Sequence, residues 1–163
     1  MKRTAQAAVV RIVLRVLYAA LVALRSRDSR ARREFERLPE GAAYSVLAAA
    51  SGPQLHVQWS GGHLRRLREP AAGACVLRIK SMKLAFSMFT GRMGLAQAYA
   101  QHAFTLQGDI ADVMRLARLI NLVEAYLFPA WMTRRMMTDV PRRECSPLLL
   151  YGAVAGVCLT GRS

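Results

Sequence analysis

The chain has 163 residues, of which 53% are apolar, and this length allows one ordinary domain with a sizeable core. The cysteines Cys75, Cys145 and Cys158 cannot all pair within one chain and show no C-x-x-C spacing, so a disulfide framework, a zinc site or a redox motif is not indicated. We expect reduced thiols in a cytosolic protein. The net charge of +14 favours an anionic partner, because self-repulsion of this size opposes a compact state.

Half of the excess charge lies in residues 1–38, which hold ten Lys or Arg and three Asp or Glu, a net charge of +7. Residues 7–24 are apolar apart from Arg11 and Arg15, so the longest uncharged run here has nine residues, whereas a membrane span needs about 20. No clear signal-peptide cleavage site follows. The apolar run at 147–159 is also short, and we expect a soluble or peripheral protein.

A helical wheel places Arg11, Arg15, Tyr18, Val22 and Arg25 on one narrow stripe and leaves a wide apolar face. Two interpretations stay open for this basic amphipathic extension, residues 1–38. The helix packs on the domain core, or its arginines Arg11, Arg15 and Arg25 contact an anionic membrane surface.

After Pro39-Glu40-Gly41 the hydrophobic period changes from helical to alternating. Leu55, Val57 and Trp59 alternate with polar residues, which is typical of a half-buried strand. Gly61-Gly62 then predicts a two-residue hairpin turn. We expect an antiparallel meander with one solvent-exposed face, formed by residues 43–50, 55–60, 63–68 and 75–80.

Helices are predicted after the meander. Ser81 can cap a helix over residues 82–90 that Gly91 ends, and a short helix over 95–101 leads to a strand at 103–107. Asp109 then caps a helix that reaches Phe128 before Pro129 stops it. We interpret Asp109 and Asp112 as capping residues rather than paired acids.

This order of elements resembles the sterol carrier protein type 2 family over residues 44–122. The local match is best at Phe104-Thr105-Leu106-Gln107-Gly108-Asp109, where alternating residues lead into Gly-Asp at a helix start. The chain departs from the family pattern at His102 and Ala103, where members carry glycine and lysine. It departs again at Met82 and Lys83, where members have a more acidic helix start.

The resemblance implies an α+β fold, in which a five-stranded, largely antiparallel sheet is covered on one face by helices with an apolar tunnel between them. It places the lipid-binding domain at residues 39–128 and leaves 129–163 as an apolar and basic segment packed on it. Relatives bind fatty acids, acyl-CoA esters, sterols, phospholipids or isoprenoid quinones without chemistry of their own, and some similar bacterial proteins are accessory subunits in ubiquinone biosynthesis.

Motifs of hydrolases, nucleotide-binding proteins and metalloenzymes are not found, and His56, His63 and His102 lack metal-ligand spacing. We therefore expect no enzymatic activity, cofactor or metal. Strand alternation and helix faces predict the tunnel lining, and frequent methionines such as Met88 and Met93 suit a pocket that repacks around its ligand. The predicted lining residues are Leu55, Val57, Trp59, Leu77, Ile79, Phe86, Phe89, Tyr99, Phe104, Leu106, Met114 and Leu119.

Two functional hypotheses follow. The first is a cytoplasmic, peripherally membrane-bound lipid carrier or lipid-presenting protein, in which the basic segments face anionic lipid; the resemblance adds, as an alternative within this class, an accessory lipid-binding subunit of a quinone-biosynthesis complex. The second is a nucleic-acid-binding protein, suggested by the charge and by the Arg/Ser run at residues 25–33. The second lacks aromatic residues interleaved with the basic ones and any nucleic-acid-reading motif, so the lipid carrier is preferred.

Overall fold

The computed structural model describes residues 2–136 and 143–160 and shows an α+β fold. Helices cover one face of a five-stranded sheet, and each predicted strand and helix of residues 43–128 is present within two or three residues of its expected ends. In chain order the elements are α1 (Lys2–Arg27), α2 (Ser29–Glu36), β1 (Ala43–Ala48), β2 (Gln54–Ser60), β3 (His63–Leu67), β4 (Cys75–Ile79), α3 (Met82–Phe89), α4 (Leu95–Ala100), β5 (Phe104–Gln107), α5 (Ile110–Leu127), α6 (Ala130–Met136) and α7 (Pro147–Thr160).

The sheet has the strand order β3-β2-β1-β4-β5. The predicted meander is wrong at one point, the position of β4. β1, β2 and β3 are antiparallel neighbours, as expected from the hairpin turn at Gly61 and Gly62, which both have positive φ. β4, however, pairs with β1 in parallel, with Tyr44 opposite Cys75. The loop after β3 crosses the sheet and leaves β3 as an edge strand. The expected five-stranded, largely antiparallel sheet is thus confirmed.

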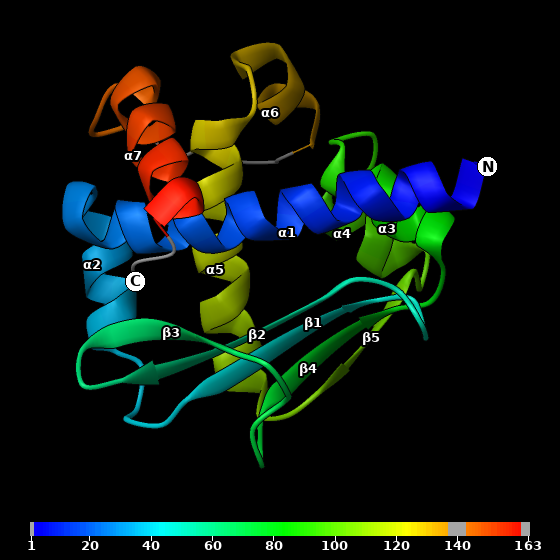
Figure 1. The fold of residues 1–163 in the computed structure, drawn as a ribbon, viewed down its shortest axis with the longest axis horizontal. Coiled ribbons are helices and arrows are strands. Elements are labelled where there is room, and N and C mark those ends of the chain that lie inside the picture. The colour runs from blue at the N-terminus through cyan, green and yellow to red at the C-terminus, as the bar shows by residue number, and fades with distance from the viewer. Residues whose placement is uncertain (1, 137–142, 161–163) are drawn as a thin grey trace.

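All the helices lie on one side of the sheet (Figure 1). The inward positions of the strands are the apolar ones of the alternating pattern, such as Val57, Trp59, Leu77 and Ile79, and these side chains are buried. The opposite face carries polar residues such as Arg65 and Arg78. The core therefore lies between the sheet and the helices, as expected for a half-buried antiparallel sheet.

α1 is part of this core. It crosses above the sheet and contacts α3, α5 and α7, and its residues Val10, Leu14, Leu21 and Leu24 are almost fully buried (Figure 1). Its opposite side is open in the first half, where Ile12 is 59% exposed. The helix thus separates the sheet from α7.

The same helix is also long and apolar enough to cross a membrane. The test rests on length and composition only, and among the described residues only the segment Arg3–Arg27 passes it. Inside the protein, 44% of the most apolar stretch of this segment is buried. Arg11 and Arg15 therefore do not exclude a span on these criteria. The buried side accounts for much of the apolar character, because it packs against the core.

Candidate functional site

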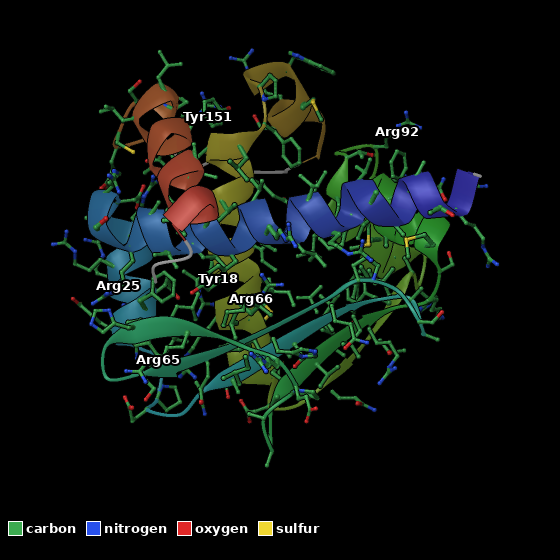
Figure 2. The ribbon with its side chains drawn as sticks, viewed as in Figure 1. Tyr18, Arg25, Arg65, Arg66, Arg92 and Tyr151 are labelled. Atoms are coloured by element: carbon green, nitrogen blue, oxygen red, sulfur yellow. The ribbon has the colours of Figure 1, made fainter. Side chains whose placement is uncertain are left out.

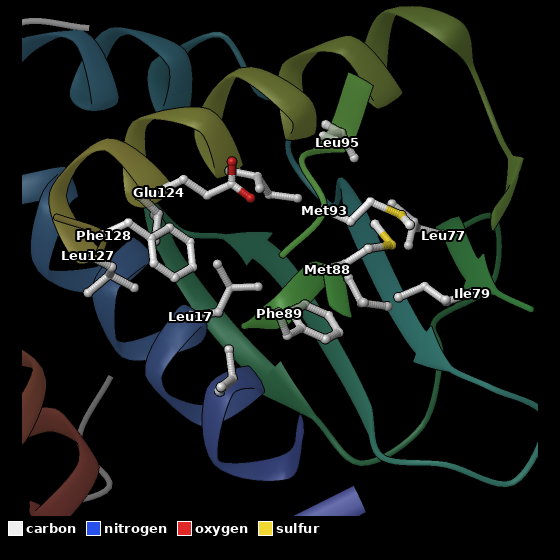
Figure 3. Close-up of a pocket in the computed structure, with 14 residues that line it drawn as sticks. Leu17, Leu77, Ile79, Met88, Phe89, Met93, Leu95, Glu124, Leu127 and Phe128 are labelled. Atoms are coloured by element: carbon white, nitrogen blue, oxygen red, sulfur yellow. The ribbon is translucent and has the colours of Figure 1, made fainter. Parts of the chain in front are cut away.

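An apolar pocket lies between the sheet and the helices (Figure 3). α1 and α5 form one wall, β1 and β4 form the floor, and α3 with the start of α4 closes the other end. Except for one carboxyl group, every side chain that lines the pocket is apolar. The lining residues are Val13, Leu17, Val46, Leu77, Ile79, Met88, Phe89, Met93, Leu95, Ile120, Val123, Glu124, Leu127 and Phe128.

Helical spacing explains why α1 and α5 supply much of this lining. Ile120, Val123, Glu124 and Leu127 follow the i, i+3, i+4, i+7 pattern, which places them on one side of α5. Val13 and Leu17 are four residues apart on α1 and face the same space. The apolar faces of both helices are visible in the sequence, but their contact is not, because it depends on how α1 crosses the sheet.

The pocket is narrow, with about 60 Å³ of free space for the centres of water-sized molecules. This is enough for a few water molecules, since one water occupies roughly 10–15 Å³ by this measure. A longer apolar chain needs side chains to move aside. Met88 and Met93 stand at the pocket, and the unbranched thioether side chain adapts readily to different shapes.

Glu124 is the one ionisable group among the described residues of the lining. Its carboxyl group points from α5 into the pocket, in the direction of Leu95 and Met93 (Figure 3). Burial raises the pKa of Glu124 to about 7, because the charged form loses its hydration. The pocket therefore has a polar group that exchanges a proton near neutral pH. Glu124 was not among the predicted site residues, although a glutamate within an apolar helix face is a signal that the sequence carries.

Three of the predicted lining residues are found in the pocket. Leu77 and Ile79 face it from β4, and Phe89 faces it from the last turn of α3. These three positions follow from strand alternation and from the helix that Ser81 caps. Met88 and Met93, which the sequence singled out as adaptable, also line it.

Other predicted residues belong to the solid core beside the pocket. Leu55, Val57, Trp59 and Leu119 are buried and pack within the core cluster, and the Trp59 ring stacks on Phe35 with ring centroids 5.2 Å apart. β2 contacts α1, and Trp59 at its end meets Phe35 of α2, so these inward side chains pack against helices rather than line the pocket. Two further predicted residues, Phe86 and Phe104, are half-buried against the same cluster.

Tyr99, Leu106 and Met114 lie outside the pocket and are 70%, 36% and 51% exposed. Leu106 has the predicted inward phase, opposite Leu77, but β5 is an edge strand that the helices do not cover fully. Met114 lies on the side of α5 that also carries the exposed Arg118, while the buried side carries Leu116 and Leu119.

The three predicted membrane-contact arginines fall in two environments. Arg11 and Arg15 are exposed on α1. Arg25 is instead held by the β2–β3 hairpin, with its guanidinium 5.3 Å from the centroid of the Trp59 ring and Nη1 3.3 Å from His63 Nδ1. Figure 2 shows Arg25 and Arg65 at the hairpin end of the molecule and Arg92 at the opposite end.

Outside the pocket, His56 has polar partners, and two cysteines are free thiols. His56 Nδ1 lies 2.8 Å from Ser45 Oγ and its Nε2 lies 3.0 Å from Gln54 Oε1, and burial lowers the pKa of His56, with the nearby Arg66 adding to this effect. Cys75 and Cys145 are free thiols, and the side chain of Cys158 lies outside the described residues. Within the described residues, no three His, Cys, Asp or Glu side chains are placed to hold a metal ion.

Comparison with solved structures finds proteins of similar fold, whereas comparison by sequence finds no match. No protein-family model matches the chain, and no curated protein matches it. A solved structure described as "UbiJ-SCP2 Ubiquinone synthesis protein" is similar, with a TM-score of 0.46 and 20% sequence identity over 76% of this chain and 98% of that chain.

Proposed function

We propose that this protein is a non-catalytic lipid carrier or lipid-presenting protein that holds an apolar chain in the pocket between α1, α3, α5 and the sheet. The observation that carries the proposal is the lining itself, in which thirteen of the fourteen side chains are apolar. Such a lining offers no cluster of groups for bond-breaking chemistry, but it removes an apolar chain from water.

The energy of binding comes from burial of methylene groups. Each buried methylene contributes about 0.8 kcal/mol, so a chain of about fifteen carbons offers on the order of 10 kcal/mol before the costs of ordering and side-chain movement. Part of this energy is spent in widening the narrow pocket around Met88 and Met93. We therefore expect an affinity well below the value that the buried area alone would give.

Native mass spectrometry of the full chain, purified without detergent, tests the proposal together with a matched pair of variants. Val13→Phe places a larger side chain in the pocket, whereas Ile12→Phe makes a similar change one residue away on the exposed side of α1. We expect a lipid adduct on the wild type and on Ile12→Phe and its loss on Val13→Phe. An adduct that persists on a folded Val13→Phe chain would contradict the proposal.

The identity of the adduct decides the finer role. Solvent extraction separates a fatty acid, acyl-CoA, phospholipid, sterol or isoprenoid quinone by mass. We propose the role of accessory lipid-binding subunit in quinone biosynthesis only for the case in which a polyprenylated quinone or its precursor is recovered. Recovery of phospholipid alone would assign a general carrier role.

We also propose that the exposed side of α1 contacts an anionic membrane, so that the carrier works as a peripheral protein. Arg11 and Arg15 flank the exposed Ile12, which combines charge with an apolar side chain. Replacing both arginines by glutamine should weaken binding to phosphatidylserine vesicles by about 2 kcal/mol, roughly thirtyfold. The matched pair Arg65→Gln and Arg78→Gln removes the same charge from the polar sheet face, and an equal loss there would contradict the proposed surface.

A further inference from the structure

Glu124 stands in the pocket at a place where an apolar residue would fit at lower cost. Its neighbours on the same side of α5, Ile120, Val123 and Leu127, are all apolar. Burying a carboxylate is unfavourable unless the group is paired or hydrogen-bonded. A carboxyl group that points into an otherwise apolar pocket is suited to a role toward a ligand, since an apolar side chain would avoid the cost of its desolvation.

The ion pairs between the described residues do not include Glu124. Arg15 on α1, Lys83 on α3, Arg92 after α3 and Arg134 on α6 are all exposed. The guanidinium of Arg143 donates to the carbonyl oxygens of Ala125 and Phe128 at the end of α5. From the sheet side, the pocket receives Val46, Leu77 and Ile79, which carry no charge. Burial is accordingly the cause of the raised pKa of Glu124.

This arrangement distinguishes between lipid ends. An ionised Glu124 accepts a hydrogen bond from a hydroxyl group, and a protonated Glu124 donates one to a hydroxyl or carbonyl oxygen. A second carboxylate brought to the same apolar space would repel an ionised Glu124, because like charges in a shared site strongly disfavour the doubly ionised state. The cost applies to a free fatty acid at neutral or alkaline pH.

We propose, on the basis of the proposed carrier function, that Glu124 selects the ligand by its polar end, so that the pocket takes a lipid with an uncharged hydroxyl or carbonyl group and rejects a free carboxylate. The polar end of the lipid lies at Glu124, and its chain runs toward Met88 and Ile79, across the pocket. Glu124 is in this account a specificity-determining residue of the lipid site.

Equilibrium dialysis at pH 8 with radiolabelled tetradecan-1-ol and tetradecanoate, which have chains of equal length, tests this inference on the full chain. We expect the wild type to bind the alcohol at least about tenfold more tightly than the acid, the factor that corresponds to roughly 1.4 kcal/mol of like-charge repulsion. Glu124→Gln keeps the shape and the hydrogen bonding but removes the charge. It should raise the affinity for tetradecanoate about tenfold and change that for the alcohol by less than about threefold.

Glu36→Gln, an equal change at an exposed position on α2, is the control and should leave both affinities unchanged. Equal binding of acid and alcohol by the wild type, or an unchanged ratio in Glu124→Gln, would overturn the selection by Glu124 and leave the carrier function standing. Failure of the wild type to bind either lipid would overturn the proposed function itself.

Discussion

The hydroxyl group of Tyr126 donates a hydrogen bond of 2.7 Å to the carboxylate of Asp28, and this bond joins α5 to the turn between α1 and α2. Asp28 is fully buried, caps α2 through the backbone amides of Arg30 and Ala31, and pairs with the guanidinium of Arg30 at 3.0 Å. The backbone N–H of Glu144 donates to the same hydroxyl at 2.6 Å. These bonds thus fix α5 to the turn at the end of α1, and Tyr126 lies two residues after Glu124 in α5.

Removal of this hydroxyl should destabilise the fold. We expect Tyr126→Phe to lower the free energy of unfolding by about 1.5–3 kcal/mol, because Asp28 and the amide of Glu144 both lose a partner in a buried place. Tyr151→Phe is the control. The Tyr151 hydroxyl donates a hydrogen bond of 3.1 Å to the carbonyl oxygen of Leu127, but Tyr151 itself is 42% exposed. Urea unfolding measures the stability of both variants. Equal losses of stability would show that the buried hydrogen bond to Asp28 stabilises the fold no more than the exposed one of Tyr151.

Acid should weaken the fold through Asp28. Burial raises the pKa of this carboxyl, but the hydrogen bonds from Arg30, Tyr126 and the amide of Ala31 outweigh burial and hold it below its ordinary value of 3.8. The folded state then binds the proton less tightly than the unfolded state, so this stability is present above about pH 4 and is lost as the pH falls through the folded value. Asp28→Asn should be less stable than the wild type at pH 6, and its stability should fall less steeply than that of the wild type as the pH drops below about 4. A loss of the same steepness in Asp28→Asn would assign the acid sensitivity to other groups.

Glu124 should give the opposite dependence on pH. Its pKa is raised from 4.5 to about 7, so the folded state holds the proton more tightly and the stability falls as the pH rises from about 4.5 to about 7. The difference corresponds to on the order of 3 kcal/mol. We expect Glu124→Gln to raise the free energy of unfolding at pH 8 relative to the wild type, with a smaller gain at pH 5. Glu36→Gln, at an exposed position, should show no such pH-dependent gain, and a Glu124→Gln chain that is no more stable than the wild type at pH 8 would contradict the cost of this buried charge.

Replacement by alanine should change the stability in opposite directions at two glycines. Gly108 has a φ of +123°, and a Cβ there would lie 3.0 Å from Cys75 Cα, so Gly108→Ala should cost about 1–3 kcal/mol. Gly152 lies in α7 with no atom within 4 Å of the added Cβ, and alanine there should stabilise by about 0.5–1 kcal/mol. Thermal unfolding of the two variants checks the pair. Stabilisation by Gly108→Ala would contradict the tight packing of the turn before α5 on β4.

Local signals predicted the elements well, because the turn at Gly61-Gly62 and the caps at Ser81 and Asp109 act within a few residues. The parallel pairing of β4 with β1 was not predictable in this way, since it joins strands that lie about thirty residues apart. The pocket was predicted only in part for the same reason. Leu77 and Ile79 follow from alternation within β4, whereas Val13 and Leu17 reach the pocket through the path of α1, which lies outside the family resemblance.

Spectra of the isoleucine methyl groups test the carrier function most directly, because the four isoleucines of the chain divide into two matched pairs. Ile79 and Ile120 line the pocket, whereas Ile12 and Ile110 are 59% and 80% exposed on α1 and α5. A ligand that enters the pocket changes the surroundings of the first pair and leaves those of the second pair unchanged.

The measurement is a titration of the chain, labelled at the isoleucine δ1-methyl groups, with tetradecan-1-ol below its solubility limit. The account predicts that the methyl resonances of Ile79 and Ile120 shift and reach saturation at one lipid per chain, while those of Ile12 and Ile110 stay in place. Shifts at Ile12 or Ile110 with none at Ile79 and Ile120 would place the lipid on the surface and contradict the account.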